Sequence, residues 1–139
     1  MKTYQRTPAE LFVELEKAED KVKHLRENQS FGLATLLQLA FDPKIKLELP
    51  EGSPPLKSDP SSPDRTLQRY DNAIRDIVVC VVENKIPAFK KEKVFIQILE
   101  SVSDKDAEII IAAKDKKLTE LYPLVTLELV KSAFPTLLQ

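Results

Sequence analysis

The stretch "SFGLATLLQLAFDP", residues 30–43, decides the fold class of this chain. Its hydrophobic residues leave almost no polar face, which predicts a central helix that is buried on all sides. Asp42-Pro43 ends this helix, because the residue before a proline avoids the helical region. Other helices of the chain or a second copy of it can cover so apolar a helix, so the oligomeric state stays open.

Helical patterns extend on both sides of this segment. Thr7-Pro8-Ala9-Glu10 has the features of a helix start, with a cap, a proline at the first position and a glutamate that can reach back. Further helices are expected from Ser62, over 90–102, from Ser103 and over roughly 126–134. We therefore predict an all-α fold, a compact bundle of five to seven helices in one domain spanning residues 1–139.

The stretch 77–82, "IVVCVV", fits two secondary structures. Its β-branched residues favour a strand. Hydrophobic residues at helical spacing continue through it, and on that ground we predict a helix while a strand stays open.

Composition excludes several classes of protein. The 139 residues carry a net charge of about -1, so no whole-protein field attracts nucleic acid or an acidic membrane. A single cysteine cannot form an internal disulfide, which fits a reducing compartment. The N-terminal residues lack the apolar region of a signal peptide, and the longest apolar run is too short to span a bilayer. We expect a cytoplasmic protein without a membrane partner.

The residues that commonly carry catalysis are scarce. Two glycines cannot form a glycine-rich phosphate loop. His24, the single histidine, lies off the apolar stripe of its helix, and Cys80 lies among valines, where burial blunts reactivity. The acidic residues around 100–108 are ordinary for a helix N-terminus. We predict no catalytic residue, no metal site, no cofactor and no enzyme activity.

The segment 42–63 is the one long irregular insertion, and it is rich in proline. Within it, "KIKLEL" alternates polar and apolar residues as a half-buried strand does. Three arrangements are open: an extended arm on the chain's own helices, a small hairpin with the stretch around Leu56, or pairing with another protein. The third makes this segment a binding arm, with the following contacts: Ile45, Leu47, Leu49, Pro54 and Pro55.

Two short clusters of lysine suggest a nucleic-acid interface as the alternative. They flank one predicted helical hairpin, and salt-dependent binding would be expected of them. Solvated helix ends explain the same residues without a ligand. The clusters comprise Lys90, Lys91, Lys93, Lys114, Lys116 and Lys117.

Three blocks carry a resemblance to a known family: "FDPKIKLELPEGSPPLK" (41–57), "FIQILESVSDKDAEIIIAAKDKKL" (95–118) and "LVKSAFPTLL" (129–138). In the same order, they resemble an uncharacterised protein family of T4-like tailed phages that is common in phages of marine cyanobacteria. Residues 64–90 show no such likeness. The resemblance implies expression in a bacterial host cell and assigns no residue a role.

Together these observations favour a small, non-catalytic phage protein that binds another protein in the cytoplasm of the infected host, as a modulator of a host factor or an accessory of replication or assembly. The partner is unknown, and a place in the virion stays open. The alternative is a nucleic-acid-binding accessory of phage replication or transcription.

Overall fold

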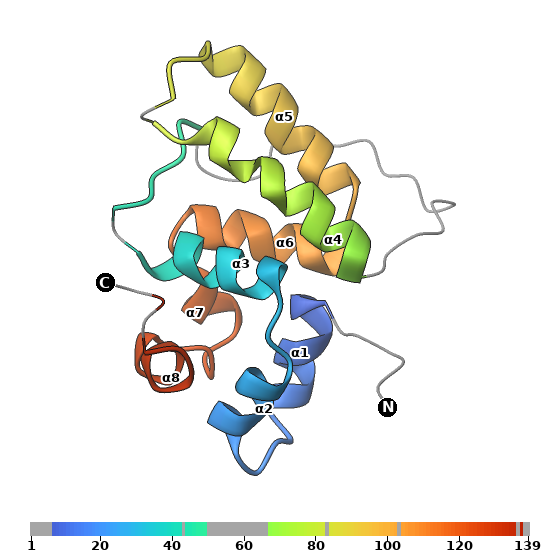
Figure 1. Ribbon diagram of the computed structural model, residues 1–139, viewed down its shortest axis with the longest axis vertical. Coiled ribbons are helices and arrows are strands. Elements are labelled where there is room, and N and C mark those ends of the chain that lie inside the picture. The colour runs from blue at the N-terminus through green and yellow to red at the C-terminus, as the bar shows by residue number, and fades with distance from the viewer. Residues whose placement is uncertain are drawn as a thin grey trace.

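The computed structural model describes residues 7–42, 44–49, 67–82, 84–102, 104–135 and 137. Within these ranges the chain forms eight α-helices and one 3₁₀ helix, so the all-α prediction is confirmed (Figure 1). The helices are α1 (Pro8–Leu15), α2 (Lys21–Glu27), α3 (Phe31–Phe41), α4 (Leu67–Ile74), η1 (Arg75–Cys80), α5 (Ala88–Glu100), α6 (Asp104–Lys114), α7 (Leu118–Leu121) and α8 (Leu127–Ala133).

The number of helices exceeds the predicted five to seven for two reasons. The first predicted helix is two helices, because the chain leaves the helical path after Glu16 and a new cap forms at Asp20, whose carboxylate accepts the Lys23 N–H at 3.0 Å. The short helix α7 was not predicted, since four residues show no period. At the start of α1, the predicted contact is present: the Glu10 carboxylate accepts the Thr7 N–H at 3.0 Å.

Helix α3 is central, as its sequence predicts. It packs against α4 and α6, and its buried residues belong to one hydrophobic cluster with those of α1, α5, α6 and α8. Figure 1 shows α3 and α6 across the middle, with the hairpin of α4, η1 and α5 on one side and α1, α2, α7 and α8 on the other. One copy of the chain therefore covers most of the apolar residues of α3, but Phe31 is 50% exposed, so the predicted burial on all sides is correct only in part.

Gly32 lets α3 approach α4 closely. A Cβ atom at this position would lie 2.3 Å from Asp71 Oδ1 and 2.5 Å from Tyr70 Cδ1, and Tyr70 is buried. The Gly32 N–H donates to the same Asp71 carboxylate at 2.8 Å. Only glycine fits this contact, which joins the first turn of α3 to α4.

The helix predicted over 77–82 is correct only in part. Helix α4 tightens into the 3₁₀ helix η1, which ends at Cys80, and Val81 then adopts extended backbone. In a 3₁₀ helix residues three apart share a face, and the buried pair is accordingly Ile77 and Cys80. A tertiary contact sets where η1 ends, because Val81 forms an antiparallel bridge with Leu47.

Candidate protein-binding surface

Residues 44–49, which we call the arm, lie on the chain's own helical body. Glu48 N–H donates to Cys80 O at 2.8 Å, and Val82 N–H donates to Lys46 O at 2.9 Å, so the arm and residues 80–82 form a short antiparallel pair. Of the three arrangements that the sequence left open, the described residues adopt the first, an arm on the chain's own body.

The apolar residues of the arm face the body. Ile45, Leu47 and Leu49 are half-buried and pack against the hydrophobic core, while Lys44, Lys46 and Glu48, which alternate with them, are exposed. The predicted alternation is therefore present, but its apolar side is largely covered by this chain. Pro54, Pro55 and the stretch around Leu56 lie outside the described residues.

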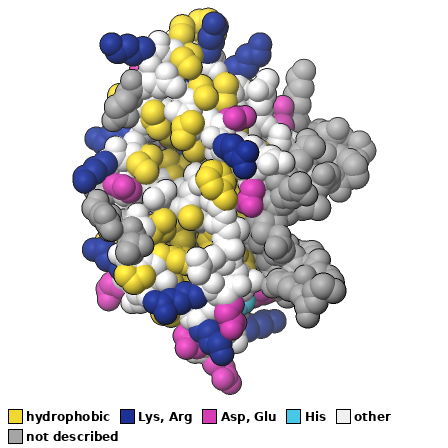
Figure 2. Space-filling view, viewed as in Figure 1, with side chains coloured by type: hydrophobic (Ala, Val, Ile, Leu, Met, Phe, Trp, Pro, Cys, Tyr) yellow, Lys and Arg dark blue, Asp and Glu magenta, His cyan; other side chains and the backbone are white. Residues whose placement is uncertain are grey.

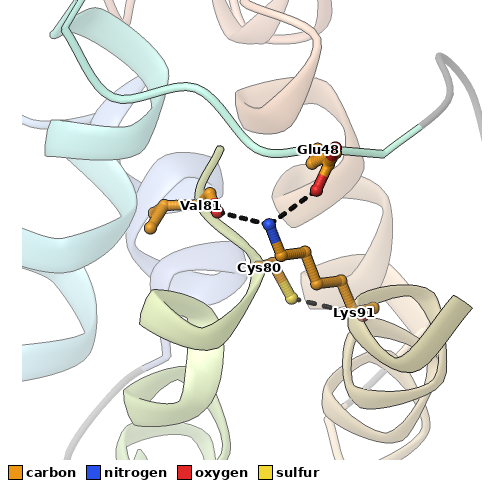
Figure 3. A network of polar contacts seen from close by, with 4 residues as sticks. All are labelled: Glu48, Cys80, Val81 and Lys91. Carbon is orange, nitrogen blue, oxygen red and sulfur yellow. Dashed lines mark hydrogen bonds and ion pairs between the residues drawn. The ribbon is translucent and has the colours of Figure 1, made fainter. Parts of the chain in front are cut away.

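Lys91 holds one end of the arm. It is fully buried, at 0% exposure, and its Nζ donates to Glu48 Oε1 at 2.6 Å and to Val81 O at 2.8 Å (Figure 3). A buried ammonium group needs such partners, because removing a charge from water is costly. The same lysine accepts through its backbone carbonyl from the Cys80 thiol, at 3.3 Å. Lys91 thus joins α5, the end of η1 and the arm.

Lys116 holds the other end of the arm. Its backbone is left-handed, with φ of 61°, a conformation that commonly ends a helix. Its Nζ donates to the carbonyls of Leu39, Asp42 and Ile45, which links the end of α3 to the start of the arm. Burial lowers the pKa of Lys116, which the Asp42 carboxylate counteracts.

These contacts place two of the six lysines predicted for a nucleic-acid interface inside the molecule. Lys91 is enclosed, and Lys114 is 9% exposed, paired with Asp115, with its Nζ 6.0 Å from the ring centroid of Phe95. Neither side chain is placed to reach a phosphate in this conformation. Lys90 and Lys93 are exposed, as are Lys116 and Lys117. Two of the six lysines are therefore enclosed, and a nucleic-acid interface at the other four stays a prediction.

The sequence contains a signal for the burial of Lys91, which the prediction of a lysine cluster did not use. Lys91, Phe95, Ile98 and Val102 follow each other at spacings of four, three and four, so Lys91 occupies the first position of the buried stripe of α5. A lysine on such a stripe is expected to be buried and paired.

Exposed hydrophobic side chains surround the turn that joins η1 to α5. Val78 is 64% exposed, Val82 51% and Phe89 70%. Figure 2 shows hydrophobic side chains gathered over the hairpin of α4, η1 and α5, with lysine or arginine side chains around its upper margin. Sequence reasoning assigned Val78 and Val82 to a regular helix and gave Phe89 no role. We call these three residues, with exposed Lys46, Lys85, Lys90 and Lys93, the α5 end.

The residues considered for catalysis occupy ordinary positions. Cys80 is buried, and burial raises the pKa of its thiol to about 11, so the thiolate is scarce at neutral pH. His24 Nε2 lies 3.5 Å from the Glu14 carboxylate, in a contact between α2 and α1. Across the described ranges, no three His, Cys, Asp or Glu side chains are grouped to hold a metal. No helix in those ranges is long and apolar enough to cross a bilayer.

Comparison with known proteins gives one match. Residues 10–120 match the model of a family described as a family of unknown function, DUF6433. No curated protein and no solved structure matches the chain. The matched range includes α2 to α6, the arm and the α5 end, and it stops at Glu120 within α7.

Proposed function

Because the chain belongs to DUF6433, a family of unknown function, we propose its role from its surface: it is a non-catalytic protein that acts by binding another protein. The observation that carries this proposal is the exposure of Val78, Val82 and Phe89 around one turn. Single exposed hydrophobic residues are common on soluble proteins, whereas a group of them commonly marks an interaction site.

The proposed contact surface is the α5 end rather than the apolar side of the arm. Ile45, Leu47 and Leu49 stabilise this surface indirectly. They pack on the core, and Leu47 pairs with Val81. Lys46 lies on the exposed side of that pair, beside Val82. The predicted contacts Pro54 and Pro55 continue the same segment of the sequence, and their part in binding stays a prediction.

We place this activity in a bacterial cell infected by a tailed phage. The support is the resemblance of residues 41–57, 95–118 and 129–138 to a family of T4-like phages, together with the single cysteine. The partner is then a host or phage protein in the host cytoplasm, bound in the course of host takeover, replication or assembly.

The test is affinity capture from infected-cell lysate after nuclease treatment. Phe89→Asp replaces the most exposed of the three hydrophobic side chains by a charged one without touching the core. Phe31→Asp is the matched control, because Phe31 is 50% exposed in the first turn of α3, where an acidic residue is tolerated. We expect the intact protein and the control to retain one partner protein that Phe89→Asp loses.

Two results would contradict the proposal. One is a partner that Phe89→Asp retains as well as the control does. The other is a lysate from which the intact protein captures no protein. Far-ultraviolet circular dichroism and thermal unfolding of both variants keep a folding defect distinct from a binding defect.

A nucleic-acid accessory is the second candidate function, and one observation favours it. Phe89 is exposed next to Lys90 and close in sequence to Lys85 and Lys93, and an aromatic ring among lysines can stack on a base. Its test is binding of a labelled single-stranded oligonucleotide at rising salt. Steep loss of binding with salt, abolished in Phe89→Ala, would support this candidate.

A further inference from the structure

In the part of the chain that the structure describes, no ion pair compensates the positive charge of the α5 end. Lys46, Lys85, Lys90 and Lys93 are exposed, and no ion pair or hydrogen bond joins their ammonium groups to another side chain in the described ranges. They come from the arm, from the turn and from the first turns of α5. The bond from Val82 N–H to Lys46 O, at 2.9 Å, brings the arm to this turn.

The carboxylates nearby do little to neutralise these lysines. Glu48 is the acid next to Lys46 along the arm, and its carboxylate is bound by the buried Lys91 at 2.6 Å. Asp76 on η1 and Glu92 and Glu100 on α5 are the other described acids on these elements, against four exposed lysines, and Glu100 lies at the opposite end of α5. Among the described residues of this surface the charge is therefore positive, in a chain whose net charge is about -1.

The hydrophobic part of this surface restricts the kind of partner. Val78 and Val82 are branched aliphatic residues that cannot stack on bases, and they gain only from apolar contact. Salt screens the charge of the lysines beyond about 10 Å. Because the net charge of the chain is negative, the whole protein does not attract a polyanion such as nucleic acid at long range. Two copies meeting through this same surface would place like charges together.

On the basis of this charge and exposure, we propose that the α5 end binds an acidic, amphipathic protein segment, with carboxylates on Lys46, Lys85, Lys90 and Lys93 and apolar side chains on Val82 and Phe89. This inference rests on the proposed function and specifies the chemistry of its partner. Charge pairs at the rim of an interface steer association and select partners, while the buried apolar centre supplies most of the affinity.

The experiment measures binding of the full chain to a labelled amphipathic peptide with leucine on one face and glutamate on the other. Three matched probes replace glutamate by lysine, leucine by alanine, or the peptide by an oligothymidine. We expect the glutamate–leucine peptide to bind best, and Lys90→Glu/Lys93→Glu to weaken it by about tenfold. The control is Lys17→Glu/Lys23→Glu, which alters the net charge of the chain by the same amount at exposed positions on the α1–α2 turn and on α2. This variant should leave binding within about twofold.

Several outcomes would overturn the inference. Equal binding of the lysine–leucine peptide would show that charge does not select the partner. Tighter binding of the oligothymidine would assign the surface to nucleic acid. Sedimentation that shows self-association, lost in Phe89→Asp, would assign it to a second copy. If Lys90→Glu/Lys93→Glu still captures the lysate partner that Phe89→Asp loses, the proposed function stands and this inference fails.

Discussion

The first turns of α5 have an inner and an outer side, and the two sides use the same residue type in opposite ways. On the inner side, Lys91 is fully buried and binds Glu48 and Val81. On the outer side, Lys90 and Lys93 are exposed around Phe89. Neighbouring residues on a helix point about 100° apart, so adjacent lysines in the sequence reach different environments. A cluster of charges in a sequence therefore does not define a charged surface.

The largest expected effect comes from removing the buried charge. Lys91→Ala leaves the Val81 carbonyl and Glu48 without their donor and creates a cavity, so we expect a loss of about 3 kcal/mol in the free energy of unfolding. Urea unfolding measures it. The matched variant on the outer side, Lys90→Ala, should stay within about 0.5 kcal/mol of the unmodified protein. Similar values for both would abolish the distinction between the two sides.

Shortening an apolar side chain of the arm should have an intermediate effect. Leu47 is half-buried against the core, and Leu47→Ala should lower the free energy of unfolding by about 1–2 kcal/mol. Thermal unfolding measures this loss. An arm that merely rests on the surface would show no change, and Ile45, Leu47 and Leu49 would then be available to a partner.

Alkaline pH should weaken the fold through Cys80, on the inner side. Its thiol has an ordinary pKa of 9.0, which burial raises to about 11 in the folded chain. Between these values the folded chain holds a proton that the unfolded chain has lost, so the free energy of unfolding falls as pH rises. Urea unfolding across pH 9 to 11 should give a shallower decline for Cys80→Ala than for the unmodified protein. Identical slopes would show that ionisation of Cys80 does not contribute to the pH dependence of the free energy of unfolding.

The smallest effect on stability is expected on the outer side. Phe89 is 70% exposed, so Phe89→Asp should change the free energy of unfolding by no more than about 0.5 kcal/mol. Differential scanning calorimetry compares the variant with the unmodified protein. A large loss would mean that Phe89 belongs to the core, and the variant would no longer serve as a test of binding.

Part of the molecule was predictable from the sequence because local chemistry dictates it. The start of α1 at Thr7-Pro8 and the end of α3 before Pro43 follow from caps and from proline. The hydrophobic period of α5 predicted the burial of Phe95 and Ile98. The alternating pattern of the arm likewise predicted which of its side chains face inward.

Tertiary structure decided the rest, since those features depend on atoms far apart in the chain. A β-branched stretch can form a helix or a strand, and the pairing of Val81 with Leu47 set where η1 gives way to extended backbone. The burial of Lys91 depends on Glu48, 43 residues away. The exposure of Val78 follows from the tighter turn of η1, which buries Ile77 and Cys80 and leaves Val78, one of the two residues between them, facing outward. A sequence lists these residues in order, but only the packed chain determines which of them meet water and which meet each other.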